Sequence, residues 1–339
     1  MGRKRLRKNY KRPRSKSQQR DYYTKTDIFI SRMASILLKP KGEVKHLFYQ
    51  RARTTIRLNN LKGDNENTYK LLTETKGWKL QDIKNMDYTY FVNNRDKSEV
   101  ANIEEYEDGK FYIQNLSTIL SIHILNPQEK EEILDLVATS GSKAVLISSL
   151  TNNEAHITVN NTDVQKISKL NNMLNQFGSQ NVEIINKDSA LLGKIYPNRY
   201  DRVILDAPSS GEGRIYLSGQ KPLRFWSIKM VNVMVKKQKE LIESAFKALK
   251  VGGTLIYSTC TLEPEENEGV VTHLLKKFPN ARMEDIDFVS KLEPLLKDKV
   301  TNGITKWSGN TYHQEVAKSI RIIPSPEMMG SYIAKITKT

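Results

Sequence analysis

Strand-like and helical segments alternate from residue 132 onward, and this alternation constrains the fold more than any other feature. At residues 164–177, Ile167, Leu170, Leu174 and Phe177 recur at helical spacing, and Gly178 follows as a helix stop. Such alternation predicts a doubly wound α/β sheet with helices on both faces, and two late strands predict an antiparallel end. We expect strands at residues 132–138, 155–160, 182–185, 201–207, 253–259, 319–324 and 331–336, and helices at residues 143–150, 164–177 and 228–249.

The N-terminal part has a different character. Apolar residues at helical spacing predict a helix over residues 26–38, which Pro40 and Gly42 are expected to end. Shorter elements follow and predict a small α/β module, with the polar stretch 94–109 as its boundary. These elements are a strand at residues 53–59, a helix at 66–75 and a strand at 88–93.

The charge of the chain points to a polyanionic partner. The net charge is +16, and residues 1–20 hold ten Lys or Arg and no acid. We expect residues 1–22 to form a disordered basic arm that binds phosphates non-specifically, with a solubilising or targeting arm as the alternative. One cysteine excludes an internal disulfide and fits an intracellular, cytoplasmic protein, and no apolar stretch is long enough to span a membrane.

That cysteine, Cys260, follows the apolar strand expected at residues 253–259. Pro264 and several acidic residues come next and predict a helix start, so the thiol lies at the carboxyl end of a strand. A lone cysteine is most often a small buried apolar residue. Ligands of open α/β sheets bind at the carboxyl ends of strands, however, which makes Cys260 a candidate for chemistry.

Two further segments end strands of the same predicted sheet. Asp206 ends the strand at residues 201–207 and precedes Pro208 and a glycine-rich loop, so we expect it beside Cys260. A buried carboxylate in this position requires a partner. The small residues at 137–143 let backbone N–H groups approach a ligand, although serine and glycine are also ordinary helix-entry residues.

Residues 206–213, 258–261 and 264–268 together resemble the Fmu/Sun-type (Nol/Nop/Sun) family of AdoMet-dependent RNA cytosine-5 methyltransferases. Segments 53–62, 109–117, 321–324 and 330–334 extend the resemblance over most of the chain. It implies a Rossmann-like methyltransferase sheet with an antiparallel C-terminal hairpin, preceded by a small α/β RNA-binding module. The expected division is a basic arm at 1–22, the RNA-binding module at 23–108 and the methyltransferase domain at 109–339.

The resemblance also implies a covalent mechanism on a cytosine of ribosomal or transfer RNA. Cys260 would add to C6 as a thiolate, so that C5 can attack the methyl group of S-adenosyl-L-methionine (AdoMet). Asp206 would protonate or hydrogen-bond cytosine N3, helped by a buried position that keeps it able to share a proton, and Lys143 would keep the reacting groups in register. The cytosine must be single-stranded or flipped out of a duplex to be reached.

The same resemblance assigns the AdoMet contacts residue by residue. The loop around the methionine part is Val137, Ala138, Thr139, Ser140, Gly141, Ser142 and Lys143. Asn161 is assigned to the ribose, Asp188 to the adenine side and Asp206 to the methyl end. Asp163 is expected to cap a helix instead of binding ribose. No metal is implied, and we expect a monomer that binds RNA and no membrane.

Three positions depart from the family pattern. The loop at 137–144 lacks the family's stiffening proline, and Asn161 replaces a carboxylate, which predicts weaker AdoMet binding. Ser209 replaces a second cysteine that assists breakdown of the adduct, which predicts slow release or water as the base. The alternative function is therefore an RNA-binding or ribosome-assembly factor with weak or lost activity. A DNA cytosine methyltransferase, which takes its nucleophile from a Pro-Cys pair, is discounted because serine follows Pro208.

Overall fold

The computed structural model describes the backbone of residues 16–339, with side chains from residue 24 onward. The chain forms two compact units, Met1–His46 and Leu47–Thr339. In the first, α1 (Lys16–Leu37) ends one residue before the predicted end. The predicted basic arm lies outside the described residues up to residue 15, and residues 16–22 begin α1. A second helix, α2 (Lys41–Leu47), was not expected; its first turn includes a bond from Val44 N to Pro40 O.

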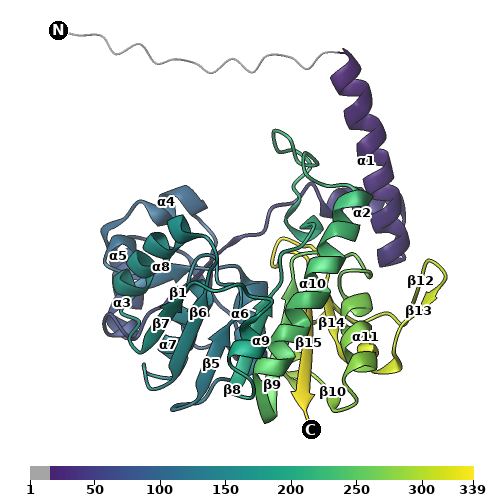
Figure 1. Ribbon diagram of the computed structural model, residues 1–339. Coiled ribbons are helices and arrows are strands. Elements are labelled where there is room, and N and C mark those ends of the chain that lie inside the picture. The colour runs from purple at the N-terminus through teal and green to yellow at the C-terminus, as the bar shows by residue number, and fades with distance from the viewer. Residues whose placement is uncertain (1–15) are drawn as a thin grey trace. The chain divides into compact units, whose positions relative to one another are not determined.

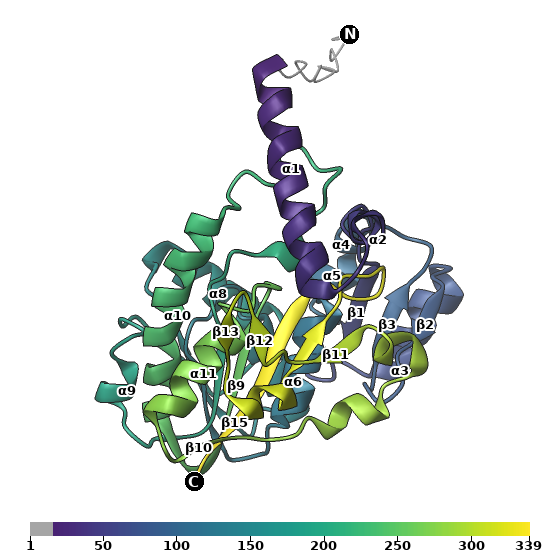
Figure 2. The same cartoon turned by 90° about the vertical axis from the view of Figure 1, so that its right-hand side faces the viewer.

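An antiparallel sheet of four strands begins the second unit, in the order β2-β3-β1-β4. Figure 1 labels its strand β1, and Figure 2 labels β1, β3 and β2. Apolar residues of β1 and β4, among them Ile56, Leu58 and Phe111, pack with Trp78 and Leu72 in its core. Because β4 pairs with β1, this sheet extends past the expected domain boundary, and the division at residues 108 and 109 stays a prediction. The strands are β1 (Thr54–Leu58), β2 (Leu80–Asp82), β3 (Thr89–Val92) and β4 (Phe111–Ile113).

Short helices accompany this sheet. The helix predicted at 66–75 is α3 (Asn65–Lys70) continued by a π-helical turn (Leu71–Thr75), and Asp64 caps it by accepting from Asn67 N. The polar stretch taken as a boundary contains α4 (Lys97–Ala101) and α5 (Glu104–Glu107). Its polar residues act as helix caps: Asp96 forms a capping box with Glu99 at the start of α4.

The larger sheet has nine strands in the order β11-β14-β15-β9-β8-β5-β6-β7, with β10 also paired to β15. Strands β5 to β9 are parallel, and β15 joins β9 antiparallel, so the predicted α/β sheet with an antiparallel end is confirmed. The strand order reverses between β5 and β8, and such a switch point is where open α/β sheets bind ligands. The parallel strands are β5 (Glu132–Asp135), β6 (His156–Asn160), β7 (Val182–Ile185), β8 (Tyr200–Asp206) and β9 (Leu249–Thr259). The antiparallel ones are β10 (Ala281–Met283), β11 (Val300–Asn302), β14 (Ile320–Ile322) and β15 (Ser331–Lys338).

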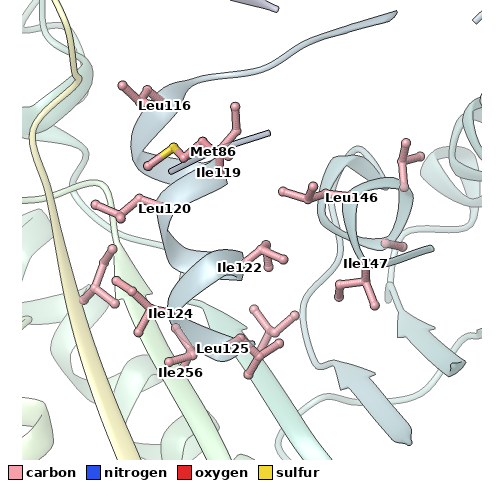
Figure 3. Packing of buried hydrophobic residues seen from close by; sticks show 14 of the residues in the cluster. Met86, Leu116, Ile119, Leu120, Ile122, Ile124, Leu125, Leu146, Ile147 and Ile256 are labelled. Atoms are coloured by element: carbon pink, nitrogen blue, oxygen red, sulfur yellow. The ribbon is translucent and has the colours of Figure 1, made fainter. Parts of the chain in front are cut away.

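Both faces of this sheet are buried, which explains the continuous apolar runs of its strands. Ile204 and Ile256 pack into the cluster on the face of α6 (Leu116–Leu125), α7 (Ser142–Leu150) and α8 (Val164–Gln176). Figure 3 shows Ile256 beside Ile124 and Leu125 of α6. Alternate residues of the same strands, such as Leu205 and Tyr257, pack with α10 (Ile228–Ala248) and α11 (Glu268–Lys277) on the other side (Figure 2).

Small elements complete the second unit. The described helices α9 (Leu192–Ile195) and α12 (Pro294–Lys297) are single turns, and β12 (Lys306–Trp307) pairs with β13 (Asn310–Thr311). Three 3₁₀ turns are η2 (Glu212–Arg214), η3 (Asp287–Lys291) and η4 (Gln314–Lys318). Among the described residues, no helix is both long and apolar enough to cross a membrane.

Candidate active site

A small cavity lies at the carboxyl ends of β8 and β9. Lys143, Asp206 and Cys260 all line it, so the structure brings the three predicted catalytic residues together. Lys143 is in the first turn of α7, Asp206 is the last residue of β8, and Cys260 directly follows β9. The remaining lining comes from hydroxyls and one apolar side chain: Ser117, Thr118, Ser121, Ser258, Thr259, Ser331 and Ile333.

Asp206 is held by two donors. Lys143 Nζ lies 2.7 Å from Asp206 Oδ2, and Ser258 Oγ donates to Oδ1 at 3.1 Å. Burial acts to raise the pKa of Asp206, but the charge and hydrogen bond of Lys143 outweigh it and bring this pKa below its usual value. The paired ammonium thus favours the carboxylate form of Asp206 against the effect of burial, and the expectation that burial keeps Asp206 able to share a proton stays a prediction.

A second carboxyl, which the sequence did not single out, lies at the end of β5. Asp135 is 2% exposed, and within the described part of the chain its Oδ1 has no hydrogen-bond partner. Burial raises the pKa of Asp135 to about 6, against the opposing charge of Lys143. A buried acid with an unpaired oxygen suits a cationic ligand group. The strand was expected to run to residue 138, so Asp135 did not stand out as a carboxylate at a strand end; the observed β5 stops at Asp135.

The Cys260 thiol has a cationic partner that sequence reasoning missed. Arg214, in η2, donates from Nη2 to Cys260 Sγ at 2.8 Å. Burial and the nearby Asp206 raise the pKa of Cys260, whereas Arg214 and then Lys143 act to lower it. Arg214 is exposed and follows no sequence pattern, so only the folded geometry brings its guanidinium to the thiol.

The loop before η2 is anchored to the Cys260 segment by two buried carboxyls. Ser210 Oγ bonds to both Glu212 and Glu266, and Thr261 Oγ1 also bonds to Glu212. The Ser210 hydroxyl has a single proton, so a proton on one of the two carboxyls would complete both bonds. Consistently, burial and the neighbouring Glu212 raise the pKa of Glu266 to about 8. Gln238 Nε2 donates to Glu266 Oε2 at 2.7 Å.

Backbone contacts fix the same loop against the C-terminal strands. Gly213 N donates to Cys260 O at 2.9 Å, and Gly330 N donates to Gly213 O at 3.2 Å. A Cβ atom on Gly213 would overlap the backbone carbonyl of Gly330, so only glycine fits between these segments.

The predicted cofactor loop follows β5 and enters α7. Gly141 has φ = 73° and stands at the N-cap of α7, a conformation that favours glycine. Thr139 and Ser140 are exposed, whereas Val137 and Ser142 are half-buried. The backbone N–H of Ala138 donates to Asn160 O at 2.9 Å. The loop thus presents hydroxyls and the start of a helix beside Lys143, which fits a ligand with an amino-acid part.

The residues predicted for the nucleoside part lie at the ends of β6 and β7. Asn161 is buried, and its amide donates to Ala138 O at 2.6 Å and accepts from Asp163 N at 2.8 Å, so it shapes the loop. Asp163 caps α8 by accepting from Gln165 N, as expected. Asp188 is exposed and accepts from Ala190 N. The ribose and adenine assignments stay predictions, and an exposed carboxylate at Asp188 suits hydroxyl or amino donors.

A family model described as 16S rRNA methyltransferase RsmB/F matches residues 122–337, which is more than half of the chain. The chain belongs to the RsmB/F family. The resemblance to Sun-type methyltransferases and the Rossmann-like methyltransferase fold are therefore confirmed, and so is the reading of the chain as an AdoMet-dependent RNA methyltransferase by family.

Named relatives of this family act on two kinds of RNA. A tRNA (cytosine(49)-C(5))-methyltransferase of Pyrococcus abyssi is 36% identical, over 86% of this chain and 89% of that protein. A ribosomal RNA small subunit methyltransferase F of Vibrio campbellii is also 36% identical, over 68% of this chain and 48% of that protein. The chain thus spans about half the length of this ribosomal RNA relative. A solved methyltransferase homologue of Pyrococcus horikoshii has a TM-score of 0.73 at 25% identity, covering 87% of this chain and 89% of that one.

Proposed function

We propose that the protein transfers a methyl group from AdoMet to C5 of a cytosine in ribosomal or transfer RNA, through a covalent adduct of Cys260 at C6. The observation that supports this best is the cavity in which the Cys260 thiol, its Arg214 partner and the Lys143–Asp206 ion pair meet. AdoMet, held by the loop at residues 137–142 with Asp188 and Asp206, would supply an electrophilic methyl group on a sulfonium.

The side chains of the protein activate the Cys260 thiol and position the cytosine ring. Arg214 stabilises the Cys260 thiolate, which adds its electron pair to C6 of the cytosine. Asp206 passes a proton from Lys143 to cytosine N3, so that the addition gives a neutral enamine whose C5 is nucleophilic, and it takes this proton back when the adduct breaks down. Lys143 keeps Asp206 oriented through the 2.7 Å ion pair. C5 takes the methyl group, then loses its proton to a base, and the C6–S bond breaks to restore the thiolate.

The last step has no second cysteine. Ser209, which stands where the family places that cysteine, lies half-buried in the loop between β8 and η2. A serine hydroxyl is far less acidic than a thiol, so water is the proposed base, and release of the adduct is the slow step.

Label transfer with a matched variant tests the proposal. With labelled AdoMet and cellular RNA, wild-type protein is expected to place label at cytosine C5, and Cys260→Ala to place none. RNA containing 5-fluorocytosine, whose C5 has no proton to lose, should form a denaturation-resistant complex with wild type alone. The absence of label at cytosine C5 with both proteins would reject the enzymatic function.

An RNA-binding or ribosome-assembly factor is the second candidate. It is favoured by the engagement of the Asn161 amide within the loop, which leaves no carboxylate at the predicted ribose position. Calorimetry separates the two functions. Micromolar AdoMet binding removes the second candidate, while tight RNA binding without AdoMet heat supports it.

A further inference from the structure

A pocket of about 420 Å³ lies beside the Cys260 cavity, formed by the chain between the end of β8 and the start of α10. Arg214 connects this pocket to the Cys260 cavity, because it lines the pocket and also donates to Cys260 Sγ. The pocket therefore opens next to the nucleophile. No residue that we assign to AdoMet lines it.

The lining combines cations with an exposed aromatic ring. Phe225 is 71% exposed, although aromatic side chains are mostly buried, and Arg224 Cζ lies 4.9 Å from the centre of its ring. Lys221 and Tyr216 line the same pocket, and Arg51 Cζ lies 4.4 Å from the centre of the Tyr216 ring. Among the described residues that line the pocket, none is acidic.

These features select a flat, anionic ligand. An exposed aromatic ring with guanidinium groups beside it provides the stacking surface on which proteins hold unpaired bases, and the surrounding cations suit the phosphates between them. A lipid surface has no flat group to match the ring, and an unphosphorylated peptide has no phosphate to match the cations. The position next to Cys260 then decides which base the pocket receives.

We propose that this pocket binds the nucleotide adjacent to the target cytosine in single-stranded RNA, with its base stacked on Phe225 and its phosphate beside Lys221 and Arg224. This inference rests on the proposed function for the identity of the target. The pocket holds the neighbouring nucleotide while the cytosine enters the Cys260 cavity.

Binding measurements on the full chain, without AdoMet, test the pocket. The probe is a short single-stranded oligoribonucleotide with one cytosine, in three forms: unmodified, abasic on the 5′ side of the cytosine, and abasic on its 3′ side. For wild type, one abasic form is expected to bind on the order of tenfold more weakly, as for loss of one base–aromatic stack. Phe225→Ala should bind the unmodified RNA as weakly as wild type binds that abasic form, and its affinity for that abasic form should be no lower still.

Matched variants separate stacking from bulk and charge. Phe225→Tyr keeps the ring and is expected to bind as wild type, whereas Phe225→Leu keeps the apolar bulk and should bind as Phe225→Ala does. Lys169→Ala, an exposed lysine on α8, controls for loss of one charge. Because Phe225 is exposed, circular dichroism and melting should match wild type for all its variants.

The outcomes distinguish this inference from the proposed function. If Phe225→Ala and the abasic site reduce RNA affinity additively, or if neither reduces it, the proposed role of the pocket is overturned, even if methyl transfer to C5 is observed. The non-additive result supports the pocket even if no methyl transfer occurs. Wild-type protein that binds none of the three RNAs overturns the pocket, and label transfer to cellular RNA then decides the proposed function.

Discussion

Cys260 is the single cysteine of the sequence, so every reaction of a thiol reagent with this protein reports on one atom. Its ionisation depends on opposing neighbours: burial and Asp206 favour the thiol, while Arg214 and Lys143 favour the thiolate. The hydrogen bond from Arg214 to Sγ makes this arginine the contact that adjusts the nucleophile most directly.

Replacing Arg214 should therefore make the thiol less reactive. Arg214→Met is expected to raise the pKa of Cys260 further and to slow its alkylation at neutral pH, by about tenfold for each pKa unit. Arg214→Lys should fall between this variant and wild type. Iodoacetamide alkylation rates measured against pH give the midpoints, and Arg282→Met, an exposed arginine on β10, is the control. An unchanged midpoint in Arg214→Met contradicts the assigned role.

At the scale of elements, the loop before η2 and the Cys260 segment are joined through Ser210 and Thr261, which bond to the buried carboxyls of Glu212 and Glu266. The folded protein raises the pKa of Glu266 from its usual 4.5 to about 8. Between these pH values Glu266 is protonated in the folded state and ionised in the unfolded state. The contribution of Glu266 to the free energy of unfolding is therefore fully present below pH 4.5 and is lost as the pH rises toward about 8.

Glu266→Gln should remove this loss of stability. The amide keeps one acceptor for Gln238 and offers a permanent donor to Ser210, as the protonated acid does. Melting temperatures at pH 6 and pH 8.5 are expected to differ less in the variant than in wild type. Glu243→Gln is the control, because Lys277 and His273 outweigh burial and lower the pKa of Glu243 below its usual 4.5, so that its replacement should leave the difference between pH 6 and pH 8.5 unchanged. An unchanged pH dependence in Glu266→Gln would contradict uptake of a proton by Glu266 on folding.

Elements whose apolar residues recur at a regular spacing were predicted well, and elements without such a spacing were missed. Strand β7 has the predicted bounds, and α8 lies within one residue of them. Helix α6 was missed because it is buried on nearly all sides, so its apolar residues follow no helical period. Strand β9 was expected to start at Gly253, but it begins at Leu249 and passes Gly252 in an irregular register against β8.

The candidate site was only partly predictable, for a related reason. Strand-end position and motif identified Cys260, Asp206 and Lys143, which all line one cavity. Asp135 and Arg214 owe their importance to strand order and loop path, which follow from packing across the whole sheet.

At the scale of the whole molecule, positive charge is concentrated in the part of the chain before the described fold. Residues 1–15 include eight Lys or Arg and no acid. Counterions released when such residues contact phosphates make RNA affinity depend on salt, with a slope of about 0.7 per contact for single strands.

Deleting residues 1–15 should weaken RNA binding similarly for all sequences and reduce the salt slope. Fluorescence anisotropy across a series of KCl concentrations measures both effects. A full-length variant with glutamine at the eight positions separates charge from length and is expected to behave like the deletion. A slope equal to that of wild type in either variant would remove these residues from RNA binding.

The position of β15 also has a consequence for synthesis of the protein. This strand lies between β14 and β9, and the backbone of Gly330 just before it is bonded to Gly213, which in turn bonds to the carbonyl of Cys260. A nascent chain that ends before residue 331 has the nucleophile and its cationic partner but lacks the strand that covers the edge of β9. The backbone bonds from Gly330 to Gly213 and from Gly213 to Cys260 can be complete only after residue 330 has been synthesised, so the geometry around the thiol depends on a segment made about 70 residues later.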